Sequence, residues 1–239
     1  MTFLRSLVFN IAFWLWSAIM NLAFLPGLLG DRLLIVRGQR LWTRGVIVLM
    51  RLFAGIRLEI RGRENLPDGP FILAAKHQSA FDTMVFHDLL DDPAIVMKRE
   101  LLSIPIYGWY CRKTEMIAVD RKAGASALKD MVRQAEAAAA KGRPIVVFPE
   151  GTRGQPGAAL PYQPGVAALY ARLGLPCVPM ALNSGLLWGR RSFAKRPGTM
   201  VMEILPAIPP GLDRKTFAAE LERRIEERSR ALLEVRPAG

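Results

Sequence analysis

The chain begins with a long apolar segment. Residues 6–30 contain no charged side chain, and their number is close to the roughly 20 residues that a helix needs to cross the hydrocarbon core of a membrane. The segment is too long and too aromatic for the core of a signal peptide, and no small-residue cleavage site follows it. We therefore expect a membrane anchor. It is either a single crossing or, because Asn21 and Pro26 could interrupt the helix, a helical hairpin that dips into one leaflet.

Arginines are spread through the next segment, residues 33–60. They are interleaved with apolar residues, which favours a segment that lies along the lipid surface with its guanidinium groups at the phosphates. These arginines are Arg37, Arg40, Arg44, Arg51 and Arg57. Only Arg5 precedes the apolar segment, and this bias predicts that the rest of the chain lies on the cytoplasmic side of the membrane. We accordingly divide the chain into an N-terminal helical anchoring segment, residues 1–56, and a domain, residues 57–239.

Beyond residue 57, short apolar runs typical of buried strands alternate with longer helical patterns. The apolar runs are residues 71–76, 93–98, 115–120, 144–149, 177–182 and 199–205. The helix candidates are residues 79–91, 124–141, 164–173 and 213–234. This order predicts an α/β fold, a layered sheet flanked by helices, that carries the N-terminal membrane anchor.

The last predicted helix has one apolar stripe and charged pairs beside it. Phe217, Leu221, Ile225 and Leu232 form the stripe. The pairs Glu220/Arg224 and Glu226/Arg230 stand four residues apart, and we expect them on the solvent side. This pattern indicates a helix that packs against the sheet and takes no part in the chemistry.

Composition narrows the functional classes. With 33 Lys and Arg against 21 Asp and Glu the formal net charge is +12, which favours an anionic membrane, a phosphorylated substrate or nucleic acid as partner. The sequence contains neither a P-loop nor a GxGxxG motif, so nucleotide binding is not indicated. It also lacks a GxSxG motif, which counts against a serine esterase. Cys111 and Cys177 form no CxxC pattern, and the only histidines, His77 and His87, form no zinc-binding motif, so we expect no metal site.

The stretch KHQSAFD, residues 76–82, has two interpretations. Ser79 and Asp82 fit a capping box that opens a helix. Alternatively, Asp82 orients the imidazole of His77 for proton transfer. Residues five apart on an ideal helix differ in direction by about 140°, so this second interpretation requires a turn between His77 and Asp82. The stretch alone does not decide between capping and catalysis.

A second stretch, FPEGTRG at residues 148–154, follows an apolar run and enters a glycine-rich loop. Loops at strand ends are where α/β proteins place their sites. Gly151 allows the backbone to approach an anion, and Arg153 offers a planar fork to phosphate oxygens. Arg121 directly follows another predicted strand, so it can converge on the same edge as Arg153 and His77.

Four ordered blocks together resemble the bacterial 1-acylglycerol-3-phosphate O-acyltransferase family of glycerolipid acyltransferases. The blocks are KHQSAFD, the MIAVDR region, FPEGTRG and CVPMALNSG, and they span about residues 70–185. The resemblance implies His77 as general base and Asp82 as its orienting partner. It also implies an acceptor phosphate site formed by Arg121, Glu150, Gly151, Arg153 and, more loosely, Thr152 and Lys98.

The resemblance also implies a reaction. An acyl group would pass from acyl-CoA or acyl carrier protein to lysophosphatidic acid and give phosphatidic acid for phospholipid synthesis, with no cofactor beyond the thioester co-substrate. Expected partners are these substrates and anionic membrane lipid, not nucleic acid. Many relatives carry Asn or a small polar residue where this chain has Lys76. Another lysolipid, such as a lyso-ornithine lipid, therefore stays open as acceptor, and so do a thioester hydrolase and a non-enzymatic lipid-binding protein.

Overall fold

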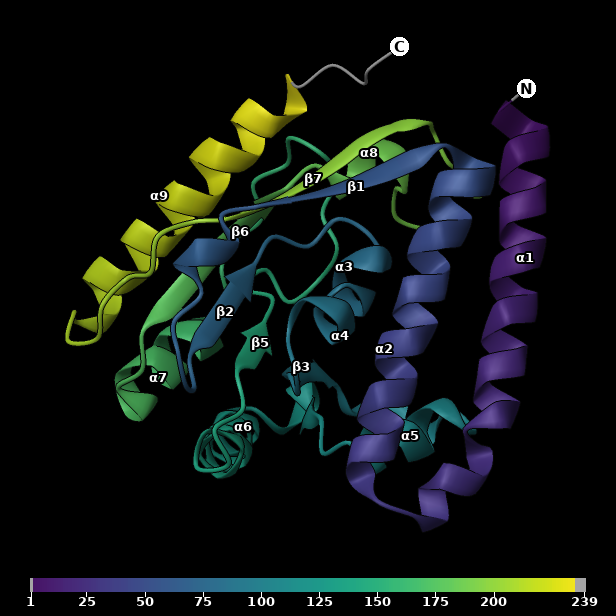
Figure 1. The fold of residues 1–239 in the computed structure, drawn as a ribbon. Coiled ribbons are helices and arrows are strands. Elements are labelled where there is room, and N and C mark those ends of the chain that lie inside the picture. Colours follow the sequence, from purple (N-terminus) through teal and green to yellow (C-terminus); the bar gives the residue numbers. More distant parts are fainter. Residues whose placement is uncertain (1, 235–239) are drawn as a thin grey trace.

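Two N-terminal helices lead into a seven-stranded sheet with helices on both faces (Figure 1). The computed structural model describes residues 2–234, so residue 1 and the last five residues of the predicted domain 57–239 lie outside the described residues. The boundary between anchor and domain near residue 56 remains a prediction.

The N-terminal helices form a hairpin, whose second arm lies beyond residues 6–30. Helix α1 (Thr2–Ala23) is followed by the 3-10 helix η1 (Leu25–Leu29), α2 (Arg32–Leu49) and the π-helical turn η2 (Met50–Ala54). Pro26 lies in the first turn of η1, and the carboxylate of Asp31 caps α2. The Trp16 indole donates to the carbonyl of Trp42 (3.0 Å), and the Trp42 indole donates to Ser17 Oγ (3.1 Å).

The outer face of the hairpin is apolar and exposed. Helix α1 is long and apolar enough to cross a membrane. The large exposed apolar residues of the hairpin include Phe3, Leu4, Ile11, Trp14, Leu15, Leu22, Leu29 and Leu52. A contiguous apolar surface of this kind on a folded protein is typical of contact with a membrane or another protein. Together with the composition of α1, it indicates association with a membrane.

The expectation for residues 33–60 is wrong in two respects. Helix α2 does not present all its arginines to lipid, because two of them form ion pairs with the domain. Arg44 lies 2.7 Å from Asp88 in α4 (Phe86–Leu89), and Arg40 lies 2.7 Å from Asp91, which follows α4. Residues 56–61 form a strand, β1 (Ile56–Arg61), that belongs to the sheet. Its sequence IRLEIR alternates apolar and charged residues, which is the period of a half-buried strand.

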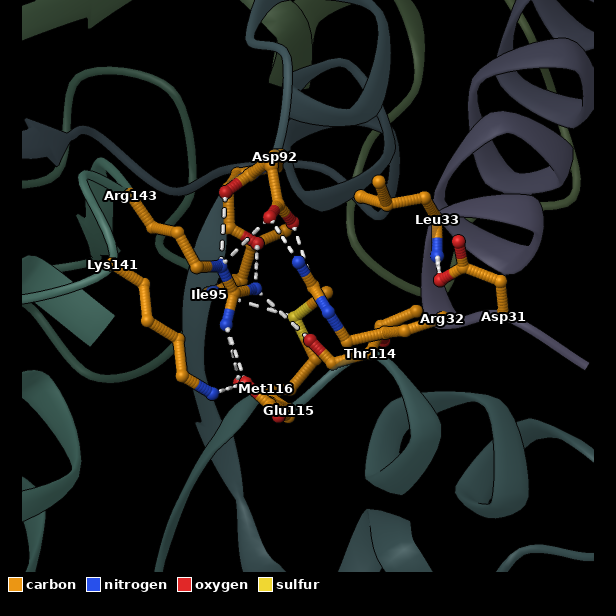
Figure 2. Close-up of polar contacts among 11 residues, drawn as sticks. Asp31, Arg32, Leu33, Asp92, Ile95, Thr114, Glu115, Met116, Lys141 and Arg143 are labelled. Atoms are coloured by element: carbon orange, nitrogen blue, oxygen red, sulfur yellow. Dashed lines mark hydrogen bonds and ion pairs between the residues drawn. The ribbon is translucent and has the colours of Figure 1, made fainter. Parts of the chain in front are cut away.

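A buried arginine fixes the far end of the hairpin to the sheet (Figure 2). Arg143 donates to the carbonyls of Pro93 (3.1 Å) and Thr114 (2.9 Å) and lies 3.2 Å from the carboxylate of Asp92. Asp92 also receives two hydrogen bonds from Arg32, at the start of α2. The hairpin is therefore held in a defined position against the domain.

The sheet has the order β1-β7-β6-β2-β5-β3-β4. Its strands after β1 are β2 (Ile72–Ala75), β3 (Ala94–Lys98), β4 (Ile117–Val119), β5 (Ile145–Val147), β6 (Cys177–Leu182) and β7 (Gly198–Ile204). All neighbouring strands are parallel except β6 and β7. The six strands that the sequence predicts are therefore present, with ends that differ by up to two residues.

Helices cover both faces of the sheet, in agreement with the layered α/β fold predicted from the sequence (Figure 1). Leu73 and Ala75 face a core shared with α1, α2, α3 (Phe81–Met84) and α4, whereas Ile72 and Ala74 face α6 (Ala125–Ala139), α7 (Pro164–Leu173) and α9 (Arg214–Leu233). The other short helices are η3 (Arg63–Asn65), η4 (Arg99–Ser103), α5 (Tyr107–Lys113), η5 (Arg121–Ala123) and α8 (Ser184–Leu187). The predicted helix 79–91 is two short helices, α3 and α4.

Candidate active site

The predicted site residues follow strands that end at one edge of the sheet. Strands β6, β2, β5, β3 and β4 are mutually parallel neighbours, so their carboxyl ends lie together. His77 follows β2, Glu150 follows β5, Lys98 ends β3 and Arg121 follows β4. Open α/β sheets bind their ligands at this edge.

A turn brings His77 and Asp82 together. Nδ1 of His77 lies 3.1 Å from Oδ2 of Asp82. The helix that follows, α3, begins only at Phe81, so His77 lies in the turn before it. The same oxygen accepts from the backbone N–H groups of Gln78 (2.6 Å) and Ser79 (2.7 Å). The carboxylate that organises the turn is therefore also the one that contacts the imidazole, so a structural role of Asp82 does not compete with orienting His77.

This contact determines which imidazole nitrogen is available for chemistry. Asp82 is completely buried, and as a carboxylate it can only accept hydrogen bonds, so Nδ1 of His77 carries the hydrogen and Nε2 has a free lone pair. The imidazole also stacks on the ring of Phe148, with ring centroids 4.1 Å apart. The arrangement holds one imidazole in one tautomer, as proton transfer requires.

The FPEGTRG loop fixes the backbone of His77 from both sides. The N–H of His77 donates to Oε2 of Glu150 (2.9 Å), and the N–H of Gly154 donates to the carbonyl of His77 (2.8 Å). These two bonds join the loop after β2 to the loop after β5. A change at Glu150 therefore acts on the position of His77.

Behind this loop lies a buried cluster of charges. The ammonium group of Lys76 lies 2.8 Å from Oε1 of Glu150 and 2.6 Å from Oε1 of Glu226, and it donates to the carbonyl of Ala158 at 3.2 Å. The hydroxyl of Tyr162 donates to Glu226 at 3.1 Å. Burial raises the pKa of the Glu150 carboxyl, and the charge and hydrogen bonding of Lys76 oppose this rise.

The place of Glu226 corrects an expectation. It is not on the solvent side of α9 but only 7% exposed, and its carboxylate points at Lys76. Position 226 borders the predicted apolar stripe, and α9 buries a wider face than that stripe, including Ser229. The solvent-side assignment was wrong because a charged residue on a wide buried face resembles an exposed one in sequence.

His77 opens onto a cavity of about 480 Å³. The predicted site residues in its lining are His77, Lys98, Arg121, Gly151, Thr152 and Arg153. Asp82 and Glu150 do not line it, because both carboxylates are buried behind the cavity wall. Within residues 2–234 no carboxylate lies within ion-pair distance of Arg121 or Arg153, so their charges are available to an anion.

Gly151 leaves room for the guanidinium group of Arg121 to lie against the FPEGTRG loop. Its φ of 65° lies in the left-handed region that favours glycine. A Cβ at this position would lie 3.2 Å from an amino nitrogen of Arg121 and 3.2 Å from Cγ of Gln163. The glycine therefore lets a guanidinium group sit against the loop that carries Arg153.

The other end of the cavity is apolar and reaches the hairpin. Its apolar lining includes Trp42, Met84, Ile95, Val96, Met97 and Leu101. A smaller cavity of about 90 Å³ between α1, α2 and α5 shares four wall residues with it, namely Gln39, Trp42, His87 and Tyr107. The site thus combines a basic, polar end with an apolar end that faces the membrane-associated helices.

The remaining candidates for acid–base or nucleophilic chemistry are unsuited to it. Burial lowers the pKa of His87 to about 4, so its imidazole is neutral at pH 7, and no carboxylate contacts it as Asp82 contacts His77 within the described residues. Burial likewise raises the pKa of the Cys111 thiol to about 11, so little thiolate forms. His77 is thus the titratable group best placed to act as a base.

Several residues that shape the site are absent from the sequence prediction. They are Lys76, Gln78, Tyr162, Arg190 and Glu226. Of these residues, Lys76 could have been found from the sequence, because it stands next to His77. Glu226 and Tyr162 lie 150 and 86 residues from Lys76 in sequence, so only the folded chain brings them together.

Comparisons with known proteins identify the family of this chain. Residues 57–183 match the family profile described as Acyltransferase. The chain is 38% identical over 185 residues to the 1-acyl-sn-glycerol-3-phosphate acyltransferase of Pseudomonas aeruginosa, covering 77% of this chain and 72% of that protein. Over 182 residues it is 30% identical to 1-acyl-sn-glycerol-3-phosphate acyltransferase alpha of Mus musculus, covering 72% of this chain and 64% of the relative.

A solved structure has the same fold. The crystal structure of the 1-acyl-sn-glycerophosphate acyltransferase PlsC from Thermotoga maritima matches across the whole of both chains, with a TM-score of 0.80 and 22% sequence identity. The structural match bears on the fold, and the profile and the Pseudomonas relative bear on the family. On these grounds the chain belongs to the acyltransferase family.

Proposed function

We propose that this acyltransferase transfers an acyl group from a thioester to the free hydroxyl of 1-acylglycerol-3-phosphate, forming phosphatidic acid. The observation that carries the proposal is the composition of one cavity. Its wall holds an imidazole oriented by Asp82, two arginines without carboxylate partners among the described residues, and an apolar end toward the hairpin. An acceptor with one hydroxyl, one phosphate and one acyl chain matches these three features.

In the proposed step, Nε2 of His77 removes the proton of the acceptor hydroxyl while that oxygen attacks the thioester carbonyl. The C–S bond then breaks, an ester forms, and the thiol leaves with a proton from the imidazolium. Asp82 stabilises that imidazolium and keeps its orientation. Base catalysis of this kind contributes about 10² to 10⁴ in rate. A thioester is already activated, so the step needs no metal, cofactor or acyl-enzyme.

Arg121 and Arg153 are the proposed ligands of the acceptor phosphate. Both line the cavity that contains His77, and a planar guanidinium can donate two hydrogen bonds to one phosphate. Lys98 and Thr152 line the same cavity and can add a charge and a hydroxyl donor. Glu150 serves this site indirectly, because it holds the backbone of His77 and does not reach the cavity.

The membrane arrangement follows from the hairpin. With its exposed apolar face in the bilayer of the cell inner membrane, the hairpin would hold the apolar end of the cavity at the lipid boundary. The lysolipid could then reach His77 without leaving the membrane. The charge bias around the apolar segment supports a catalytic domain on the cytoplasmic side.

The test is product analysis with purified full-length protein in neutral detergent. Acyl-CoA and acyl carrier protein thioester are each supplied with 1-acylglycerol-3-phosphate, a lysophospholipid with a larger head group, a lyso-ornithine lipid, or no acceptor. The proposal expects phosphatidic acid as the preferred product. Faster acylation of another lysolipid, or release of free fatty acid without any acceptor, would replace it with a different acyltransferase or a hydrolase.

A further inference from the structure

A second hollow, of about 690 Å³, adjoins the candidate active site. One wall is the end of the FPEGTRG loop and the residues that follow it, and the other wall is residues 185–196, after β6. Four arginines line it and no acidic residue does: Arg153, Arg190, Arg191 and Arg196. The sequence analysis assigned a role to Arg153 alone, so three of these arginines have no function in the proposed reaction.

No carboxylate neutralises the charges of these four arginines within the described residues. Other arginines do pair with carboxylates, as Arg228 does with Glu203 at 2.7 Å. The guanidinium group of Arg190 is held in place by a hydrogen bond that it donates to the carbonyl of Arg153 (3.2 Å). Concentrated positive charge without counter-charges is an anion site.

The backbone at the hollow is also unusual. Arg191 has a φ of 56°, in the left-handed region that non-glycine residues seldom adopt. Conformations of this kind are disfavoured, and they occur most often at ligand-binding and catalytic positions. The conformation places consecutive arginines, Arg190 and Arg191, on the same hollow.

The hollow continues into the cavity of His77 but does not include the catalytic pair. Thr152, Arg153, Arg190 and Arg191 line both spaces, whereas His77 and Arg121 line only the first. A ligand could therefore place one end beside His77 and its charged end in the hollow. The acceptor does not need this space, because its single phosphate is accounted for at Arg121 and Arg153.

We propose that the hollow binds the pyrophosphate and ribose phosphate of a coenzyme A thioester, and so determines the acyl donor. The proposal rests on the proposed function, since that reaction needs a donor whose carbonyl lies at His77. Several phosphates on a thin pantetheine arm match Arg190, Arg191 and Arg196, which the acceptor phosphate leaves free. The prosthetic group of an acyl carrier protein offers only one phosphodiester. A planar array of lipid head groups would match a flat basic face better than a hollow.

The proposal is tested first by equilibrium binding, without any acceptor. Coenzyme A, 4′-phosphopantetheine and pantetheine are titrated by calorimetry into the full-length protein in neutral detergent, using the wild type, Arg191→Ala and Arg196→Ala. Both arginines are exposed, so the variants should fold. Each should weaken coenzyme A binding about 10-fold, as expected for a lost charge-assisted hydrogen bond, and leave pantetheine binding unchanged. Arg133→Ala, which removes an exposed arginine of α6, is the matched control and should change neither.

Kinetics then separate the possible ligands of the hollow. The two variants should raise KM for acyl-CoA about 10-fold and leave KM for the lysolipid within twofold. Three results would overturn the proposal. They are a rise in KM for the lysolipid instead, an equal rise in KM for acyl-pantetheine, and a larger rise in KM for acyl carrier protein thioester than for acyl-CoA. So would unchanged coenzyme A binding combined with weaker binding to anionic vesicles, which would identify lipid head groups as the ligand. If the wild type binds coenzyme A through these arginines yet acylates no 1-acylglycerol-3-phosphate, the proposed acceptor is wrong while the donor site stands.

Discussion

Replacing Lys76 by methionine tests the buried charge cluster behind the active site. Lys76 is 1% exposed and contacts two carboxylates, Glu150 at 2.8 Å and Glu226 at 2.6 Å. Methionine has a similar shape and no charge, so the variant leaves both carboxylates buried without an ammonium. Removing one partner of a buried ion pair costs about 3 to 5 kcal/mol. For a chain of this size the melting temperature should fall by about 6 to 20 °C.

The loss of stability should depend on pH in a definite direction. Burial raises the pKa of Glu150 and Lys76 opposes that rise, so without Lys76 the Glu150 carboxyl retains its proton in the folded state at pH values where it is ionised in the unfolded state. The folded variant then binds more protons than the unfolded chain, so its stability falls as pH rises. The difference in melting temperature between wild type and Lys76→Met should therefore be larger at pH 8 than at pH 5.

The measurement is thermal unfolding of the detergent-purified proteins by circular dichroism at both pH values. Lys141→Met is the matched control, because Lys141 forms an ion pair of 2.6 Å with Glu115 but both side chains are substantially exposed. Such a pair contributes at most about 1 kcal/mol. The double variant Lys76→Met/Glu226→Gln, which restores the net charge of the cluster, should regain part of the loss. Equal melting temperatures for Lys76→Met and Lys141→Met would refute the account of the cluster.

Three further predictions concern the site itself. Asp82→Asn should lower kcat about 10² to 10⁴-fold with little change in either KM, because the amide cannot stabilise the imidazolium; normal turnover in steady-state assays would remove Asp82 from the mechanism. Gly151→Ala should raise KM for the acceptor by displacing Arg121, whereas Gly174→Ala, at a similar φ of 60° with open space around it, should not; equal KM values for the two variants would exclude this role of Gly151. Burial lowers the pKa of His87 to about 4, below its unfolded value of about 6.5. As pH falls from 6.5 to 4, the unfolded chain binds a proton at His87 that the folded chain does not, so the free energy of unfolding falls by about 3 kcal/mol. His87→Leu should therefore flatten the melting temperature over that pH range, and an unchanged pH dependence would contradict the burial argument.

Local patterns were sufficient to predict most of the sheet. Buried strands such as β2 and β6 are continuous apolar runs, because parallel strands covered on both faces have no polar side. Strand β1 was missed since it lies at the edge of the sheet, where its arginines resemble those of the preceding helix.

The candidate site was predictable where its residues are close in sequence. His77 and Asp82 are five residues apart, and the turn that the catalytic interpretation required between them is present. The side chain of Glu150 was expected near the acceptor, but the structure directs it inward to Lys76, because a buried ammonium attracts it more strongly than solvent does. Contacts of this kind join segments distant in sequence, and no local pattern encodes them. The arginines of the second hollow were missed for the same reason.

The central claim is that His77 is the base that activates the acceptor hydroxyl. The most direct measurement is the rate of phosphatidic acid formation from acyl-CoA and 1-acylglycerol-3-phosphate by wild type and His77→Ala, purified in detergent and matched for melting temperature. The account predicts that His77→Ala loses about 10² to 10⁴-fold in kcat while both KM values stay close to those of the wild type. Phosphatidic acid formation at a near wild-type rate by His77→Ala would contradict it.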